Sequence, residues 1–224
     1  MEAFLTEQPE MGKSGRIARS RSYGQGRRGT RRRSADSIKF LTKEQFRALL
    51  RAIPKENIRD RLLVNLMYLH ALRRREAALL RLEDFADGRI FVRRLKGGRS
   101  LWYQMFPSSI ALLRRYLAIR PKDDCPYLFR GLRHGCAPLA GRTIAALFQR
   151  YAIAAGLPPD LRHPHVLRHS LGTHLANEGI DISDAAEQLG HTELSSTAIY
   201  FQITDRRRAK VHRRMRRSRE IVRN

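Results

Sequence analysis

The sequence predicts a mainly helical α+β domain that contains one small antiparallel β-sheet. Apolar residues recur at helical spacing along most of the chain, which favours helices. The exception is the stretch 88–105, where short β-favouring runs flank Lys96-Gly97-Gly98, a pattern typical of a hairpin. With 224 residues, of which 42% are hydrophobic, the chain is long enough for one substantial core.

Composition divides the chain into three parts. Residues 1–37 are rich in Gly, Ser and Arg, and we expect a basic arm that is disordered when free. Residues 38–205 carry the periodic apolar pattern and form the predicted folded domain. Residues 206–224 are a second basic segment, a C-terminal tail that is compatible with a helix.

Positive charge is the strongest compositional signal. The chain has 45 Lys and Arg against 21 Asp and Glu, a net charge of +24. Residues 13–33 and 206–219 each hold nine basic and no acidic side chains, and the part between these arms keeps a net charge of +9. Basic arms increase affinity for a polyanion through counterion release. We therefore expect double-stranded DNA as the partner.

Other classes of protein are disfavoured. No apolar run approaches the ~20 residues of a membrane span, and the N-terminus lacks the apolar region of a secretory signal, so no membrane partner is expected. Cys125 and Cys136 form no CxxC pattern, which argues against a disulfide framework or a zinc ribbon. These features predict a cytoplasmic protein with two reduced thiols.

The first helix is predicted to follow Thr42, because Thr42 and Gln45 form a capping-box pattern. Its apolar positions are Phe46, Leu49, Leu50 and Ile53. A second, buried helix comes next, lined by Leu62, Leu63, Leu66, Met67 and Leu69. Beyond the hairpin, helical spacing returns at 108–119 and at 141–157, where Gly156 is expected to stop the helix.

Three short helices are expected at the C-terminal side of the domain. The first begins at Pro164, a residue suited to a first helical turn. His165, Arg168 and His169 follow at i, i+3 and i+4, so they share one face close to the helix N-terminus, where the helix dipole favours an anion. The opposite side is apolar: Val166, Leu167, Leu171 and Leu175. This pattern predicts a phosphate-binding face backed by a core.

The last two helices present a histidine and a tyrosine. Gly190 is expected to end one helix in a left-handed conformation, which holds His191 at a sharp turn. Tyr200 lies nine residues later on a final amphipathic segment, whose buried side is predicted to be Ala198, Ile199, Phe201 and Ile203. A phenolic oxygen can attack phosphorus and leave a covalent phosphotyrosine.

Two more polar positions lie upstream. Arg73 and Glu76 are three residues apart, so the carboxylate can fix the guanidinium, which matters if Arg73 binds a phosphate through both of its terminal nitrogens. Lys96 lies at the tip of the glycine-rich hairpin, where it is exposed and suited to reach a bound duplex.

Together these motifs resemble the catalytic domain of the tyrosine recombinases, or phage integrase family. The series "ALRRREAALLRLEDF", "RLKGG", "HPHVLRHSLGTHL" and "LGHTELSSTAIY" follows the family's order and spacing over roughly residues 38–205. The resemblance implies that Arg73 and Arg168 hold the scissile phosphate, with Glu76 in support. It further implies that Lys96 protonates the leaving 5′-oxygen.

The resemblance also assigns the remaining polar groups. His165 and His191 match the two active-site histidines, Tyr200 matches the nucleophile and His169 matches a supporting position. The implied activity is that of a site-specific recombinase or integrase of a mobile element, which cleaves and rejoins DNA through a 3′-phosphotyrosyl intermediate. No metal or nucleotide cofactor is implied. The expected assembly is a monomer when free and a homotetramer on synapsed DNA.

The chain departs from the family pattern at two points. Ala71 replaces the glycine that usually precedes "LR", a small-for-small change with no obvious consequence. Family members usually carry an N-terminal core-binding domain, whereas about 37 residues precede the catalytic domain here. In this respect the chain resembles the short recombinases that switch fimbrial promoters in bacteria, and the basic arms are expected to compensate in part.

The same residues are compatible with other classes of protein. A type IB topoisomerase-like enzyme would use the same residues without partner DNA, and a DNA-binding protein could keep the fold without turnover. His163, His165 and His169 have a spacing seen in metal ligands, but Arg168 would repel a zinc ion. Two-metal nuclease chemistry needs clustered carboxylates. The acidic residues are scattered instead, with Glu83, Asp84 and Asp87 in a predicted loop.

Overall fold

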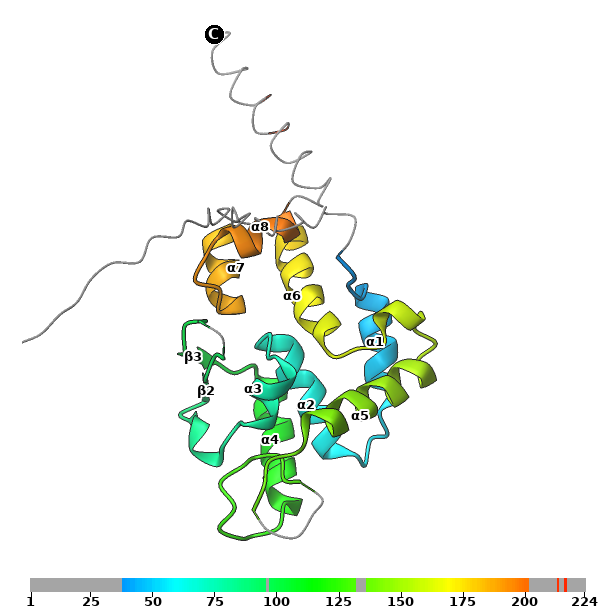
Figure 1. The fold of residues 1–224 in the computed structure, drawn as a ribbon, viewed down its shortest axis with the longest axis vertical. Helices are drawn as coiled ribbons and strands as arrows, with labels where there is room; N and C mark the ends of the chain where they lie inside the picture. Colours follow the sequence, from blue (N-terminus) through cyan, green and yellow to red (C-terminus); the bar gives the residue numbers. More distant parts are fainter. Residues whose placement is uncertain (1–37, 96, 132–135, 202–212, 214–215, 217–224) are drawn as a thin grey trace, which may run out of the picture. The chain divides into compact units, whose positions relative to one another are not determined.

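The computed structural model describes residues 38–95, 97–131, 136–201, 213 and 216 (Figure 1). Its longer helices are α1 (Lys43–Ala52), α2 (Ile58–Leu69), α4 (Pro107–Ile119), α5 (Gly141–Ala154) and α6 (His165–Glu178). The shorter ones are α3 (Arg74–Ala78), α7 (Ile182–Leu189), α8 (Ser195–Phe201) and the 3-10 turns η2 (Leu82–Asp84) and η3 (Pro159–Leu161). The predicted mainly helical α+β fold is confirmed.

One three-stranded antiparallel sheet, in the order β1-β2-β3, accompanies the helices. It consists of β1 (Phe85–Ala86), β2 (Arg89–Val92) and β3 (Leu101–Gln104). Asp87 and Gly88, with φ of 49° and 72°, make the tight turn between β1 and β2, as Asp-Gly pairs do in two-residue hairpins. β2 pairs with β3 in the register Phe91–Trp102, so the hairpin predicted around residues 96–98 is confirmed.

The acidic residues before the sheet do not form the predicted loop. Glu83 and Asp84 lie in η2, and the Asp84 side chain is buried. Asp84 Oδ2 accepts a hydrogen bond of 2.8 Å from the Arg81 backbone N–H, and its other oxygen pairs with Arg93. This satisfied carboxylate caps a turn, a role that spacing alone did not reveal.

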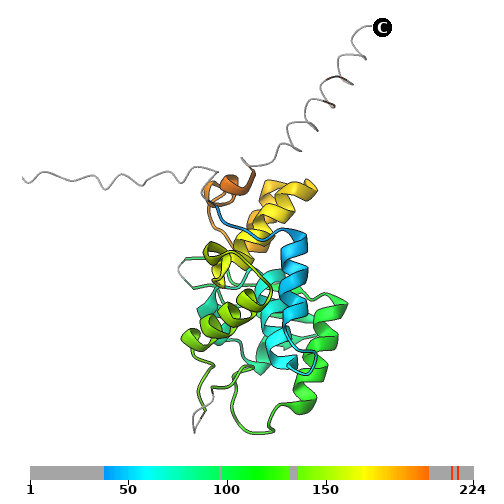
Figure 2. The same cartoon turned by 90° about the vertical axis from the view of Figure 1, so that its right-hand side faces the viewer.

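A large hydrophobic core surrounds α2, which contacts α4 and α6. In both views α4 lies beside α2 (Figures 1 and 2). The capping box of α1 is present as predicted, because the Thr42 hydroxyl accepts from the Gln45 N–H at 3.1 Å and the Gln45 side chain accepts from the Thr42 N–H. Leu62, Leu63, Leu66 and Met67 of α2 are buried in this core.

A second, much smaller apolar cluster lies where α6, α7 and α8 contact one another. We call it the tyrosine cluster; its buried members are Ile38, Ala71, Leu171, Ala176, Leu189 and Tyr200. The predicted buried side of α8 was right only in part. Ile199 and Phe201 pack against this cluster, but the fully buried residues of α8 are Thr197 and Tyr200, and Ala198 is only partly covered. Ile203 lies outside the described residues.

No helix in the described ranges is both long and apolar enough to cross a membrane. Cys125 is a buried free thiol and Cys136 an exposed one. The predicted basic arms, residues 1–37 and 206–224, lie outside the described residues apart from two positions, so their expected roles stay predictions.

Candidate active site

Arg168 is a charged side chain buried at the start of α6. Pro164 precedes the helix with helical dihedral angles, which supports the predicted start. Only 2% of Arg168 is exposed, and its Nη1 donates to the Ala71 carbonyl at 2.7 Å. Its Nη2 is buried and has no hydrogen-bond partner among the described residues. A buried donor without a partner is costly, so this nitrogen is a ready contact for an incoming anion.

The Arg168 guanidinium lies among other cations. Burial lowers its pKa to about 10, and the nearby charges of Arg73 and Arg94 act in the same direction. The group is still protonated at neutral pH. Burial and mutual repulsion make it unfavourable to hold several charged arginines together. Such a site is suited to an anionic ligand, which would relieve the repulsion.

Arg73 precedes α3 and is held by Glu76. Arg73 Nη1 donates to Glu76 Oε1 at 2.7 Å and to the Leu95 carbonyl at 3.1 Å, and the Arg73 backbone N–H donates to Glu76 Oε2 at 2.9 Å. Burial alone would raise the pKa of Glu76, but hydrogen bonds from Arg73 and the charge of Arg94 bring it below its usual value. Glu76 is therefore a buried carboxylate that fixes the orientation of Arg73.

Ala71, in the turn between α2 and α3, has an unusual backbone. Its φ of 50° lies in the left-handed region that favours glycine, so this alanine carries a strain of about 1–2 kcal/mol. Its methyl group is fully buried in the tyrosine cluster, which offsets part of that cost. The change from the family's glycine therefore has a structural consequence that the sequence analysis did not foresee.

His191 follows the end of α7, where Gly190 has the predicted left-handed conformation with φ of 65°. The His191 Nδ1 atom is 2.8 Å from the Thr197 hydroxyl of α8. Burial lowers the pKa of His191 to about 4, and the charges of Arg168, Arg73 and Arg94 add to this effect. His191 is thus a neutral hydrogen-bonding group at pH 7.

Tyr200 of α8 packs directly against α6. It is 2% exposed, and its hydroxyl is 2.9 Å from His169 Nδ1. The His169 ring contacts the His165 ring, with centroids 4.4 Å apart. A Cβ at Gly172 would lie 2.7 Å from the Tyr200 ring, so only glycine leaves room for the tyrosine there. Burial raises the pKa of the Tyr200 hydroxyl, although Arg168 and Arg73 oppose the shift.

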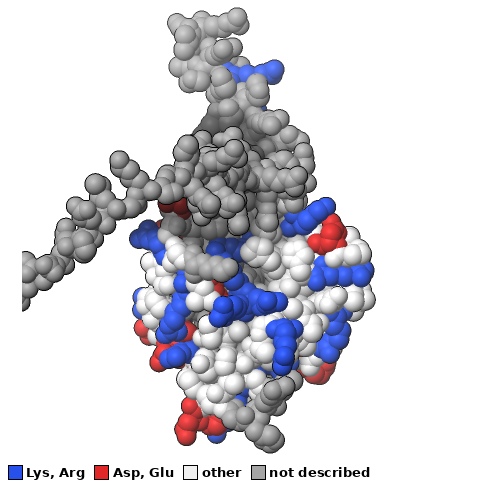
Figure 3. All heavy atoms as spheres, viewed as in Figure 1, with Lys and Arg blue, Asp and Glu red and all other residues white. Residues whose placement is uncertain are grey.

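A pocket of about 570 Å³ opens beside these groups. Its lining residues are Arg73, Arg74, Arg75, Leu95, His163, Pro164 and His165. Figure 3 shows Lys and Arg side chains gathered across the middle of this face, while Asp and Glu lie nearer its rim. The pocket is therefore a cationic recess that fits a phosphate better than a neutral ligand.

The structure brings most of the predicted site residues together. Arg73, Glu76, His165, Arg168, His169, His191 and Tyr200 form one connected region. Lys96 lies outside the described residues. Among the His, Cys, Asp and Glu side chains that the structure describes, no group of three or more is arranged to hold a metal ion.

Sequence analysis missed one member of this region, Arg94. It follows Ile90 and Val92 at a spacing of two, so the alternation of β2 placed it on the buried side of the sheet. An arginine that continues the alternation of two buried aliphatic residues could have been recognised as a buried charge. Gly172 was missed as well, because its close approach to Tyr200 depends on how α8 packs.

Comparison with known proteins gives consistent similarities. The model of the phage integrase family matches residues 39–207. Tyrosine recombinase XerA of Pyrococcus furiosus is 39% identical over 169 residues, which cover 74% of this chain and 58% of that protein. The chain thus spans less than two thirds of that relative.

Solved structures are similar as well. The crystal structure of XerA recombinase matches with a TM-score of 0.66 and 25% identity, over 79% of this chain and 63% of that one. XerH site-specific recombinase, bound to its difH substrate in a pre-cleavage complex, matches with a TM-score of 0.62 and 25% identity, over 72% of this chain and 49% of that one.

Proposed function

The chain belongs to the phage integrase family, and from this premise we propose that it is a site-specific recombinase that cleaves and rejoins double-stranded DNA. One observation carries the proposal: the buried Arg168, with Nη2 unpartnered among the described residues, lies close enough to Arg73 and Tyr200 for their charges to interact. Two cations that can bind a phosphate therefore lie near a phenol, and this arrangement supports the proposal.

Arg73 and Arg168 bind the scissile phosphate. Each guanidinium is anchored to protein acceptors, Arg73 to Glu76 and Arg168 to the Ala71 carbonyl. Donors that are fixed in advance stabilise the charge that develops on the non-bridging oxygens, and removal of one such donor typically costs about 10²–10³ in rate. Neutral His191 adds a hydrogen bond on the same side.

Tyr200 is the nucleophile. Its oxygen forms a bond to phosphorus, the bond from phosphorus to the 5′-oxygen breaks, and a 3′-phosphotyrosyl link remains. The tyrosine proton leaves toward the histidine pair, where His169 already contacts the hydroxyl and His165 lies next to it. Lys96 protonates the departing 5′-oxygen. A 5′-hydroxyl of a second DNA then reverses the step, which exchanges strands.

Burial of Tyr200 sets a requirement for this reaction. Because the residue is 2% exposed, a DNA phosphate contacts its hydroxyl only after the surrounding side chains or α8 shift. The raised pKa means that the phenol is protonated at neutral pH, so a proton acceptor is needed at the moment of attack.

DNA is the partner, and assembly depends on it. Support for DNA comes from the net charge of +24, the cationic pocket and the relative XerH, which is bound to its difH substrate. We infer a monomer in free solution, because nine like charges in residues 206–219 oppose self-association. Strand exchange between two duplexes requires a homotetramer on synapsed DNA. The cytoplasm is the expected compartment.

A nicked suicide duplex from the native locus tests the proposal. The wild-type protein is expected to form a covalent adduct on a denaturing gel, also in EDTA, and Tyr200→Phe is expected to bind the duplex without forming it. An adduct of undiminished yield from Tyr200→Phe would contradict the assignment. Relaxation of plasmids that lack the site, without recombinant product, would instead favour the topoisomerase-like alternative.

A further inference from the structure

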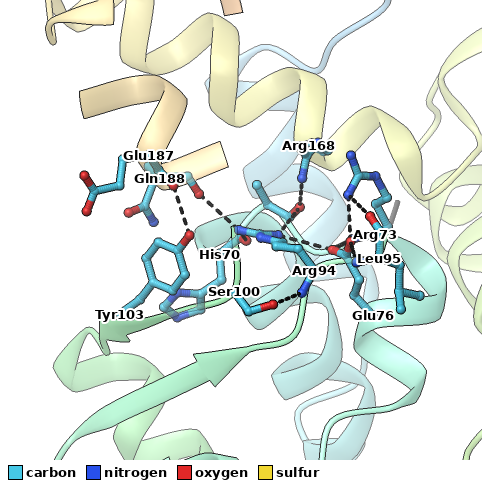
Figure 4. A network of polar contacts seen from close by, with 11 residues as sticks. His70, Arg73, Glu76, Arg94, Leu95, Ser100, Tyr103, Arg168, Glu187 and Gln188 are labelled. Atoms are coloured by element: carbon cyan, nitrogen blue, oxygen red, sulfur yellow. Dashed lines mark hydrogen bonds and ion pairs between the residues drawn. The ribbon is translucent and has the colours of Figure 1, made fainter. Parts of the chain in front are cut away.

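Arg94 is, with Arg168, a buried cation of the site region. Its side chain is 0% exposed, and it lies two residues after β2, a strand that buries the aliphatic residues Ile90 and Val92. Arg168 Nη2 has no partner among the described residues, whereas both terminal nitrogens of Arg94 already bind protein acceptors. Figure 4 shows its guanidinium in the centre of a polar network, between the helix end that carries Gln188 and the turn that carries Arg73.

The contacts of Arg94 join separate parts of the site. Nη2 donates to the His70 carbonyl at 2.9 Å and to the Gln188 carbonyl at 3.3 Å. Nη1 donates to the Ala71 carbonyl at 3.2 Å and to Glu76 Oε2 at 3.2 Å. One guanidinium thus connects the turn after α2, helix α3 and the end of α7.

Arg94 shares its acceptors with both phosphate-binding arginines. The Ala71 carbonyl accepts from Arg168 as well as from Arg94. Glu76 accepts from Arg73 as well as from Arg94. Any movement of Arg94 therefore alters the acceptor of each of the other two arginines.

Two glycines allow the chain to close around Arg94. A Cβ at Gly190, the residue before His191, would collide with Arg94 Nε. A Cβ at Gly98, on the far side of the hairpin tip, would lie 2.8 Å from both the Arg94 Cβ and the Gly190 carbonyl oxygen. The hairpin and the His191 turn therefore meet at this arginine.

We propose that Arg94 is a positioning residue that fixes the phosphate-binding arginines, the His191 turn and the hairpin relative to one another. This inference rests on the proposed recombinase function. Arg94 touches no substrate and acts through Arg73, Arg168 and His191.

The site region should remain folded without this side chain. Tyr103 donates to the Glu187 carbonyl at 2.9 Å (Figure 4). Gln188 Nε2 donates to the Leu69 carbonyl at 2.7 Å, so α7 keeps two other connections to the rest of the domain. Glu76 keeps its contacts with Arg73 and with the Leu95 N–H. Removal of Arg94 thus loosens the site without leaving Glu76 unpaired.

Arg120 supplies a matched control. As a whole residue it is as buried as Arg94, with 6% exposed against 7%, and it also binds backbone carbonyls, those of Pro121, Cys125 and Tyr127. Its loop contains none of the proposed site residues. A purely structural role for Arg94 would make Arg94→Met and Arg120→Met behave alike.

The test is the single-turnover rate of adduct formation on the nicked duplex at saturating DNA, with thermal stability measured in parallel. Arg94→Met is expected to form adduct about 100-fold more slowly than wild type, which is the upper end of the loss typical for a residue that supports the binding side chains. Its DNA affinity should be nearly unchanged. Arg120→Met is expected to lose comparable stability and keep the wild-type rate below its melting temperature. A wild-type rate in Arg94→Met, or equal slowing in Arg120→Met, would overturn the proposal.

Two further readings complete the test. The pKa of His191 is lowered by burial, then by Arg168 and Arg73, and also by Arg94. Loss of Arg94 should therefore move the acid limb of the rate profile to higher pH.

Arg94→Lys keeps the charge but has a single nitrogen for several acceptors, so its adduct should form about 10-fold more slowly than that of wild type. If Arg94→Met does not fold, a wild-type rate in Arg94→Lys refutes the inference. Absence of adduct from the wild type would remove the proposed function itself.

Discussion

The arginine side and the tyrosine side of the site are built differently. Arg73, Arg94 and Arg168 are anchored to the turn after α2 and to Glu76, next to the large core around α2. Tyr200 instead lies in a cluster with only five other buried residues, held by α6, α7 and α8. The arginines have fixed acceptors, whereas Tyr200 has a histidine contact and close packing on Gly172.

This difference follows from what each side does in the proposed reaction. A phosphate is best stabilised by donors that do not reorganise, and a buried, nearly saturated network provides them. The nucleophile must become accessible, form a bond and be released again, and a small cluster opens at lower cost than a large core. The two sides should therefore respond differently to substitution.

The largest effect is expected from the arginine side. Arg168→Ala removes a phosphate donor and leaves the Ala71 carbonyl with Arg94 as its remaining side-chain donor. The rate of adduct formation should fall by about 10²–10³. Arg168→Lys keeps a charge but not the two-nitrogen geometry, and it should recover only part of the rate. Full activity in the lysine variant would show that charge alone is sufficient on this side.

A smaller effect is expected from packing on the tyrosine side. Gly172→Ala places a methyl group 2.7 Å from the Tyr200 ring and forces the ring or α8 to move. Overpacking of this kind costs about 1–3 kcal/mol of unfolding free energy, and adduct formation should slow while DNA affinity is retained.

Gly141→Ala is the control for this substitution. Its added Cβ would meet only the flexible Arg74 side chain, at 3.2 Å, at the start of α5. Because Arg74 lines the pocket but its side chain is flexible, Gly141→Ala should slow adduct formation much less than Gly172→Ala. Equal rates for Gly172→Ala and wild type would show that Tyr200 tolerates displacement.

Much of this arrangement followed from local sequence signals. The Thr42–Gln45 capping box, the glycine that ends α7 and the hairpin depend on neighbouring residues, and all three were predicted. The buried face of α8 and the central place of Arg94 were not. Both depend on contacts between segments about 30 to 100 residues apart, such as Gly172 with Tyr200 and Arg94 with Gln188. Such contacts leave no periodic signal; the alternation of β2 indicates that Arg94 is buried, but not which groups it binds.

The last expected effect is absent at neutral pH: it is a pH dependence of stability on the arginine side. His70 is fully buried with no hydrogen-bond partner for either ring nitrogen among the described residues, and burial, with a contribution from Arg94, lowers its pKa to about 4. The unfolded chain therefore binds this proton more readily. His70 therefore does not reduce the free energy of unfolding above pH 6.5. As the pH falls toward 4, protonation of the unfolded chain lowers this free energy by on the order of 2–3 kcal/mol.

His70→Leu removes this titrating group. Urea unfolding at pH 7.5 and pH 4.5 should show a smaller loss of unfolding free energy for the variant than for wild type, with the acid response of His174 and His191 still present. Parallel curves for the two proteins would mean that His70 does not titrate in this range.

The identity of the residue linked to DNA tests the central claim most directly. Trypsin cleavage after Arg168 and Arg206 yields a peptide in which Tyr200 is the sole tyrosine. Mass spectrometry of the peptide attached to a trapped, nuclease-trimmed duplex should identify residues 169–206 with the phosphate on Tyr200. Attachment through any other residue, Tyr103 near Arg94 included, would contradict the account.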